Sequence, residues 1–399
     1  MSRSSQNNFL VLDIGTTGIK ALVLDSRLEI LAEAYRPLTR LTPRANWVEQ
    51  KPDQLLSASQ LVLSEAVQSS GLAVSDLAGL GITNQRETTI LWDKETRRPI
   101  YNAIVWEDKR TVKFCDGLKV KYNQLISDKT GLCLDPYFSA SKIWWLLENV
   151  AQAQKLSQQD RLAFGTVDSW VLANWLASNE HLTDSTNASR TLLYNVRRLQ
   201  WDGELASIFN IPVTMLPEVK PSAHQYGEIK KDILGEKLPI LAVCGDQQAS
   251  TYAAGADDGT TKITYGTGTF LAQQIGTKFA VHQPFFTMLL ASKDKPIYAV
   301  EGKVESSARK VDAVLDKPKE LREVITSLAK KVDKYIQQLP LKPDKIVVDG
   351  GITKYKHLAG IQAEISGVPV ERQRTCQSTA LGVAKMMRDN LAVKNKPVQ

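Results

Sequence analysis

The chain has 399 residues, of which 43% are apolar and 23% charged, and its formal net charge is +7. These values are typical of a globular protein of about two domains and exclude fibrous, disordered and membrane-spanning classes. The positive charge lies after position 292, where lysines alternate with acidic and apolar residues at helical spacing. This pattern favours solvated faces of amphipathic helices over a nucleic-acid-binding segment. The four cysteines are scattered, which favours reduced cytosolic thiols over disulfides or a metal site.

A β-meander is expected near the N-terminus, where apolar runs at 9–13, 19–25 and 28–35 are separated by short turns. The first run is too short for the hydrophobic part of a secretion signal, which favours a cytoplasmic location. The first turn has the sequence D-I-G-T-T-G over Asp13–Gly18. Its backbone N–H groups and threonine hydroxyls suit phosphate oxygens. Hairpin turns that bind nothing also favour glycine and threonine.

The buried strand expected over Leu77–Thr83 ends in the polar run T-N-Q-R-E-T-T. Arg86 and Glu87 in this run can reach one polyol only if the backbone turns, because neighbouring strand residues face opposite sides. Taken alone, such a pair is more often a surface ion pair. Trp106, taken alone, is more often part of a core.

Two later strands end in Asp and Gly, and α/β folds place ligands at such strand ends. They close with Gly245-Asp246 and with Asp349-Gly350-Gly351. Asp246 can accept a proton from a substrate hydroxyl or cap a helix, and one role does not exclude the other. The regular elements expected after the meander are a helix over 53–69, strands over 77–83 and 90–93, helices over 142–149 and 168–177, and strands over 238–243, 261–264, 270–272 and 346–348.

A second glycine–threonine turn, Y-G-T-G-T over Tyr265–Thr269, repeats the arrangement of the first. Two such turns, with Asp13 in the first and Asp246 before the second, indicate a nucleotide held between duplicated halves. The phosphate-binding pattern G-x-x-x-x-G-K-[ST] does not occur in the sequence.

Several runs resemble glycerol kinases of the FGGY carbohydrate kinase family. The likeness is continuous over 9–276 and resumes over 345–386. The T-N-Q-R-E stretch is similar to the glycerol branch rather than the pentulose branch. The runs that carry the resemblance are G-I-T-N-Q-R-E-T-T-I-L-W (81–92), P-I-Y-N-A-I-V-W (99–106), D-P-Y-F-S (135–139), T-D-S-T-N-A-S-R-T (183–191), G-D-Q-Q-A (245–249) and Y-G-T-G-T-F (265–270).

The resemblance implies an α/β, actin/hexokinase-like (ribonuclease H-like) duplicated two-domain fold with a reduced second domain. The N-terminal domain is expected over 1–250 and the C-terminal domain over 251–399. The implied activity is ATP-dependent phosphorylation of glycerol to sn-glycerol 3-phosphate with Mg²⁺. Glycerol and ATP/ADP are therefore the expected partners, with no nucleic acid and no membrane insertion, and a homo-oligomer is left open.

The same resemblance implies a role for individual residues. Asp246 matches the catalytic base, and Asp13 matches the magnesium-associated acid. The residues that match the glycerol site are Arg86, Glu87, Trp106, Tyr137, Asp246, Gln247 and Phe270. The residues that match the nucleotide site are Thr16, Thr17, Gly18 and Lys20 in the first turn, Gly266, Thr267 and Gly268 in the second, and Gly350 and Gly351.

The chain departs from the family on the nucleotide side. The segment between Phe270 and Asp349 is much shorter than in the family. Ala308, Asp312 and Tyr355 stand where Gly, Gln and Asn are usual in the family. A helix that is apolar in the family is expected here to carry the charged residues Lys303, Glu305 and Arg309, which suggests that the deletion newly exposes its surface. Two alternatives therefore stay open: a glycerol-binding pseudokinase with weak or no activity, and a kinase of another small polyol.

Overall fold

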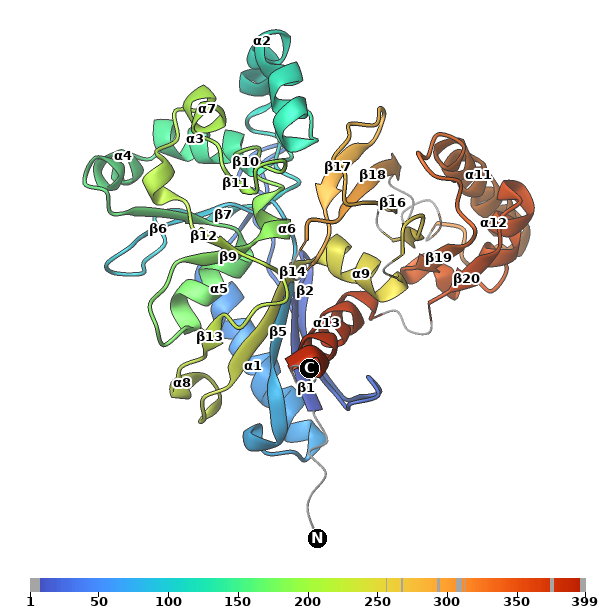
Figure 1. Ribbon diagram of the computed structural model, residues 1–399, viewed down its shortest axis with the longest axis horizontal. Helices are drawn as coiled ribbons and strands as arrows, with labels where there is room; N and C mark the ends of the chain where they lie inside the picture. Colours follow the sequence, from blue (N-terminus) through green and yellow to red (C-terminus); the bar gives the residue numbers. More distant parts are fainter. Residues whose placement is uncertain are drawn as a thin grey trace, which may run out of the picture.

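Two six-stranded sheets dominate the computed structural model, which describes residues 8–255, 257–266, 268–292, 295–305, 311, 313–373 and 377–394. Two helices lie between the sheets (Figure 1): α9 (Asp246–Ala254) and α13 (Ser378–Lys394). This arrangement confirms the actin/hexokinase-like α/β fold. Within the described ranges, every helix is either too short or too polar to cross a bilayer.

The first sheet has the order β13-β14-β5-β1-β2-β3. Strands β1, β2 and β3 form the expected antiparallel meander, and β5 and β14 run parallel to β1. The carboxyl ends of parallel strands lie at the same edge of a sheet, so the residues that follow β1, β5 and β14 lie close together there. The strands are β1 (Asn8–Ile14), β2 (Gly18–Leu24), β3 (Ile30–Pro37), β5 (Leu77–Asn84), β13 (Gly227–Glu228) and β14 (Pro239–Gly245).

The second sheet repeats this topology in the order β17-β18-β16-β15-β19-β20. Its antiparallel part is β15-β16-β18, and β19 and β20 run parallel to β15. The expected duplication is therefore present, and the shortened second half keeps its full sheet. The strands are β15 (Thr261–Tyr265), β16 (Thr269–Gly276), β17 (Phe286–Leu289), β18 (Tyr298–Glu305), β19 (Ile346–Asp349) and β20 (Val370–Arg372).

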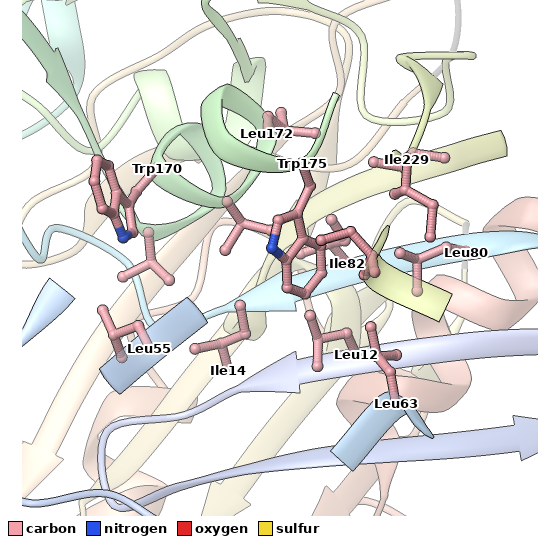
Figure 2. Packing of buried hydrophobic residues seen from close by; sticks show 14 of the residues in the cluster. Leu12, Ile14, Leu55, Leu63, Leu80, Ile82, Trp170, Leu172, Trp175 and Ile229 are labelled. Carbon is pink, nitrogen blue, oxygen red and sulfur yellow. The ribbon is translucent and has the colours of Figure 1, made fainter. Parts of the chain in front are cut away.

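The two faces of the first sheet are covered by different helices. Leu12 and Ile14 of β1 pack against α1 (Pro52–Ser70) and α5 (Val167–Trp175), as Figure 2 shows around Trp175. Phe9 and Val11, which point the other way because strand side chains alternate, pack against α13. A helix late in the chain thus completes the core around the first sheet.

The second sheet is covered by α11 (Pro318–Ile336) and α12 (Leu358–Ser366). The apolar stripe of α11 is buried and its charged residues lie outside, which confirms the expected amphipathic helix. The expected helix around Lys303 is wrong: Lys303 and Glu305 end β18, where pairing with β16 competes successfully with helix formation. Arg309 lies outside the described residues.

Helices α2, α3, α4 and α7 surround a separate core above the first sheet in Figure 1. The sequence-based boundaries of the expected strands and helices are confirmed to within a few residues. Cys115 and Cys244 are buried and free, Cys133 is partly buried and free, and Cys376 lies outside the described residues. The other elements are β4 (Glu49–Gln50), β6 (Ile90–Asp93), β7 (Ala103–Ile104), α2 (Val112–Thr130), α3 (Ser139–Asn149), α4 (Ala151–Gln158), β8 (Leu162–Gly165), β9 (Leu182–Asp184), α6 (Ser185–Ala188), β10 (Tyr194–Asn195), β11 (Gln200–Trp201), α7 (Gly203–Ile208), β12 (Glu218–Lys220), α8 (Lys231–Leu234) and 3-10 turns at Val74–Asp76, Val213–Met215 and Gly351–Lys354.

Helices α9 and α13 cross at very close range. A Cβ atom on Gly382 would lie 1.8 Å from the carbonyl oxygen of Ala249, so only glycine fits at this crossing. The expected domain boundary between 250 and 251 falls inside α9. That division of the chain stays a prediction.

Candidate active site

The turn over Asp13–Gly18, which is expected to bind phosphate and is called the first phosphate turn below, lies between β1 and β2. Gly15 N–H donates to the carbonyl oxygen of Gly18 at 3.0 Å, which closes the turn. Trp106 Nε1 donates to Thr16 Oγ1 at 2.8 Å. A Cβ at position 18 would come within 2.4 Å of the Tyr35 ring, so this exposed side chain would have to move if Gly18 were replaced. Thr17 lies in the same turn and contributes its carbonyl oxygen to Leu38 N–H.

Asp13 and Lys20 face each other across this hairpin, and both are tied to the start of α13. Asp13 Oδ2 accepts a hydrogen bond from Thr379 Oγ1 at 2.6 Å. Lys20 Nζ donates to Gln377 Oε1 at 3.0 Å. Burial raises the pKa of Asp13, partly offset by the Thr379 hydrogen bond and the charge of Lys20. Thr379 was not identified from the sequence.

The second phosphate turn, within Tyr265–Thr269, lies against Asp349-Gly350-Gly351 at the end of β19, called the D-G-G segment below. Gly266 N–H donates to the Gly268 carbonyl oxygen at 3.2 Å, and Thr267 lies outside the described residues. Gly350 has a φ of +95°, and a Cβ there would lie 2.4 Å from the Tyr265 carbonyl oxygen. By contrast, a Cβ added to Gly351 would meet no other described heavy atom within 4 Å. The segment therefore offers exposed backbone next to the second turn.

The first residues of α13 connect the two turns. Thr379 bonds to Asp13 in the first sheet, and the neighbouring Ser378 donates to Asp349 in the second. Lys262 Nζ lies 3.1 Å from Asp349 Oδ2 on the other side. Asp13, the first turn, the second turn and the D-G-G segment therefore lie around the start of one helix.

Arg86 and Glu87 follow β5 at the same edge of the first sheet. Glu87 has a φ of +60°, so the backbone turns there and brings both side chains to one site. The side chains are 2% and 1% exposed, which rules out the surface ion pair. The Arg86 guanidinium Nε lies 3.8 Å from Glu87 Oε1 and 3.4 Å from Asp246 Oδ1.

Two further charged residues complete a buried cluster with this pair. Arg190 Nε donates to Glu87 Oε1 at 2.5 Å, and its Nη2 donates to Glu301 Oε1 at 3.0 Å. Arg86 Nη1 donates to Glu301 Oε2 at 2.9 Å. Neither Arg190 nor Glu301 was assigned from the sequence. Arg190 lies in the run T-D-S-T-N-A-S-R-T, so its signal was present, whereas Glu301 lies outside the stretches 9–276 and 345–386 that carry the resemblance to the family.

Asp246 is the first residue of α9, directly after β14, with Gly245 as the N-cap residue. Its Oδ1 accepts from the N–H of Gln247 at 2.7 Å. Burial raises the pKa of Asp246 to about 6, with a contribution from Glu87, while Arg86 acts in the opposite direction. Gln248, missed from the sequence, accepts from Arg86 Nη1 at 3.1 Å.

Aromatic side chains line the space beside this cluster. The Trp106 and Tyr137 rings meet edge to face, with centroids 5.5 Å apart. Lys142 is fully buried and donates to the carbonyl oxygens of residues 136–138, which holds the Tyr137 loop. A cavity of about 190 Å³ is lined by Lys109, Asp135, Tyr137, Phe138, Phe270, Phe286, Glu301 and Lys303.

The departures from the family lie around this site only in part. Lys303 is exposed at the cavity, with Nζ 5.8 Å from the Trp106 ring centroid and 5.9 Å from that of Phe270. Tyr355 ends the turn after the D-G-G segment and contacts His357, with ring centroids 5.4 Å apart. Ala308 and Asp312 lie outside the described residues.

The donors near Asp13 fit a magnesium ion bound mainly through phosphates. Within the part of the chain that the structure describes, no three His, Cys, Asp or Glu side chains group as a metal site. Mg²⁺ commonly keeps several waters and uses one or two carboxylates plus substrate phosphates. A single carboxylate beside the first phosphate turn suits that mode of binding.

Comparisons with known proteins show the family and the fold of the chain. The model of the FGGY family of carbohydrate kinases, N-terminal domain, matches residues 8–253, and that of the C-terminal domain matches 299–387. Glycerol kinase 1 of Clostridium tetani is 36% identical over 94% of this chain and 88% of its own length, and glycerol kinase 2 of Thermotoga maritima is 35% identical over the same shares. A crystal structure of Plasmodium falciparum glycerol kinase with ADP superposes with a TM-score of 0.91 at 27% identity, covering 98% of this chain and 91% of that chain. Gluconate kinase from Lactobacillus acidophilus shares the fold, with a TM-score of 0.86 at 19% identity over 98% of this chain and 90% of that chain.

Proposed function

The chain belongs to the FGGY family of carbohydrate kinases, and on that basis we propose that it transfers the γ-phosphoryl group of ATP to glycerol, giving sn-glycerol 3-phosphate. One observation carries the proposal: Arg86, Glu87 and Asp246 meet at the sheet edge where Trp106 contacts the first phosphate turn. A hydroxyl held by the three charged groups is thereby adjacent to a phosphate held by the turn. The glycerol kinases among the relatives support glycerol as the acceptor.

In this proposal Arg86 and Glu87 hold two hydroxyls of glycerol, as donor and acceptor. Trp106, Tyr137 and Phe270 contact its carbons, and Gln247 adds a polar contact next to Asp246. Such placement matters because phosphoryl transfer depends on positioning and charge stabilisation more than on covalent chemistry by the protein.

Asp246 is proposed as the general base. The terminal hydroxyl oxygen of glycerol bonds to the γ-phosphorus, the bond from that phosphorus to the β–γ bridging oxygen breaks, and the hydroxyl proton passes to Asp246. ADP leaves with the bridging oxygen. A carboxyl with a pKa of about 6 is mostly ionised at pH 7 and still a better base than an ordinary aspartate.

The nucleotide side is proposed to use both turns. Thr16, Thr17, Gly18 and Lys20 contact the phosphates from the first sheet, Gly266, Thr267 and Gly268 from the second, and Gly350 and Gly351 the adenosine. Asp13 would hold Mg²⁺ through water. The bound ion neutralises charge on the phosphate oxygens.

A coupled ADP-release assay with glycerol and ATP tests this function, using the Asp246→Asn variant. We expect glycerol-dependent ADP release by the natural chain and a loss of about 10²- to 10⁴-fold in kcat in the variant. Glycerol affinity should change little, because the amide keeps its hydrogen-bonding capacity. Asp116→Asn, at an exposed position of α2, is the matched control and should be unaffected. Full turnover by Asp246→Asn would exclude this residue as the base.

A second candidate, a glycerol-binding protein without turnover, is favoured by one observation. The alignment with the Clostridium tetani relative spans 437 positions, more than the 399 residues of this chain, so the relative has residues without a counterpart here. Calorimetry for glycerol and ATP separately distinguishes the candidates. Glycerol binding without ADP release supports the second candidate, and turnover only with another polyol indicates a different acceptor.

A further inference from the structure

Glu301 reaches the candidate glycerol site from the second sheet. It lies in β18, whereas Arg86, Glu87 and Arg190 all belong to segments that follow strands or helices of the first half. Its side chain is 4% exposed, and its carboxylate accepts from two arginines. Oε2 lies 2.9 Å from Arg86 Nη1, and Oε1 lies 3.0 Å from Arg190 Nη2 and 3.4 Å from Arg86 Nη2. One carboxylate therefore connects two guanidinium groups across the two halves of the molecule.

The cluster depends on this carboxylate for charge balance. Two fully buried guanidinium groups close to each other and to one carboxylate, Glu87, would leave an uncompensated positive charge, which is costly inside a protein. Glu301 makes the count equal while Asp246, 3.4 Å from Arg86, is protonated, and an ionised Asp246 adds a third negative charge. Burial alone would raise the pKa of Glu301, but the charges of Arg190 and Arg86 hold it at about 2, so the carboxylate is ionised at any working pH.

The contacts of Glu301 also determine which atoms of Arg86 stay available. With Nη1 engaged by Glu301 and Gln248, the guanidinium is oriented so that Nε faces Asp246 at 3.4 Å. Arg190 Nη1 and Gln248 Nε2 are buried donors without a hydrogen-bond partner among the described residues. Buried donors of this kind normally have a partner, which fits a polar ligand next to the cluster. Glu301 itself forms part of the cavity wall with Tyr137 and Phe270.

We propose that Glu301 is a positioning residue for the kinase reaction: it orients Arg86 for the acceptor hydroxyl and balances the charge around Asp246 from the opposite half of the molecule. The inference rests on the proposed function. Its consequence is that the acceptor site is complete only while β18 is seated against the first half. The alternative is a buried ion pair that contributes to folding alone.

Three variants separate the two explanations. Glu301→Gln keeps the shape of the side chain and removes its charge, and Glu301→Asp keeps the charge on a side chain too short to reach both arginines. Glu371→Gln is the matched control, since Glu371 lies in β20 of the same sheet in an exposed ion pair with Lys345. Circular dichroism and the thermal midpoint establish that each full-length variant is folded before kinetics are measured.

For Glu301→Gln we expect the KM for glycerol to rise about 10- to 100-fold, with a much smaller change in the KM for ATP. The acid limb of kcat/KM should move to lower pH by about one unit, because the uncompensated arginine charge favours the carboxylate form of Asp246. Glu301→Asp should restore the position of the acid limb while the KM for glycerol stays high. Glu371→Gln should match the natural chain in both measurements.

The outcomes separate this inference from the proposed function. If the natural chain turns over glycerol and folded Glu301→Gln shows a KM within twofold and an unshifted acid limb, Glu301 is a folding ion pair and the inference is wrong. If the natural chain binds glycerol without turnover, the same comparison by calorimetry decides it: weaker binding in Glu301→Gln supports the inference although the kinase function has failed. If the natural chain binds no glycerol at all, both are overturned.

Discussion

The acid–base chemistry of Asp246 is decided by its immediate neighbours. Burial and the nearby Glu87 carboxylate raise its pKa to about 6, and the Arg86 guanidinium lowers it again. The unprotonated form is the competent base, so activity should be high above this pKa and fall as the pH drops through it. The proposal therefore gives Arg86 two roles: it binds the acceptor and sets the pH range of the proposed base.

We expect kcat/KM for glycerol to show an acid limb near pH 6. In Arg86→Ala the limb should move to higher pH, because a cation that favours the charged form is lost, and glycerol binding should weaken by about 1.5–3 kcal/mol. Arg86→Lys keeps a positive charge but loses the planar fork, so its limb should stay near pH 6 while its glycerol affinity falls. Identical acid limbs in Arg86→Ala and the natural chain would show that Arg86 does not act on the base.

At the scale of elements, the crossing of α9 and α13 links the chemistry to the fold. Asp246 opens α9, and Thr379, which bonds to Asp13, lies near the start of α13. The two helices touch where Gly382 meets the Ala249 backbone. Any displacement at this contact changes the distance between the base and the first phosphate turn.

Gly382→Ala should therefore impair both stability and turnover. Its Cβ would lie 1.8 Å from a backbone oxygen, so the helices must separate, and overpacking of this kind costs about 1–3 kcal/mol. Gly360→Ala is the control, because Gly360 lies in α12 where an added Cβ meets open space, and alanine is the better helix former by about 1 kcal/mol. The midpoint of thermal unfolding and the rate of ADP release are measured for both variants. Equal midpoints for the two variants would show that the crossing tolerates separation.

At the scale of the whole molecule, the two halves carry different parts of the proposed reaction. The acceptor residues and the first phosphate turn belong mainly to the first sheet, and the second turn and the D-G-G segment belong to the second. The shortened stretch after Phe270 keeps a six-stranded second sheet, and Tyr355 stands next to the D-G-G segment that is proposed to contact adenosine. Phosphate binding is therefore expected to be preserved better than base recognition.

A competition series of ATP, GTP and inorganic tripolyphosphate tests this expectation. We expect their affinities to lie within about tenfold of one another, a difference of about 1.4 kcal/mol. Glycerol affinity, measured separately, should be less affected than ATP affinity by the departures from the family. Tight ATP binding with strong rejection of GTP and tripolyphosphate would show that the short second half has a complete adenine site.

Local sequence patterns determined most of the elements. Short apolar runs separated by turns predicted β1, β2 and β3, and the stripe of α11 predicted its buried face, because these patterns depend on residues only a few positions apart. The two turns, Asp13 and Asp246 could likewise be found from residue type and position, and the family motifs predicted Arg86 and Glu87 as acceptor residues.

Only the tertiary structure decided how these parts meet. The φ of +60° at Glu87 brings Arg86 and Glu87 to one site, and no strand pattern predicts that turn. Glu301 reaches Arg86 across 215 positions, and Thr379 reaches Asp13 across 366. Strand β18 continues through 303–305, where a helix was expected to begin, because pairing with β16 outweighed local preference. Contacts of this range depend on the packing of both sheets around α9 and α13, which no local pattern in the chain specifies.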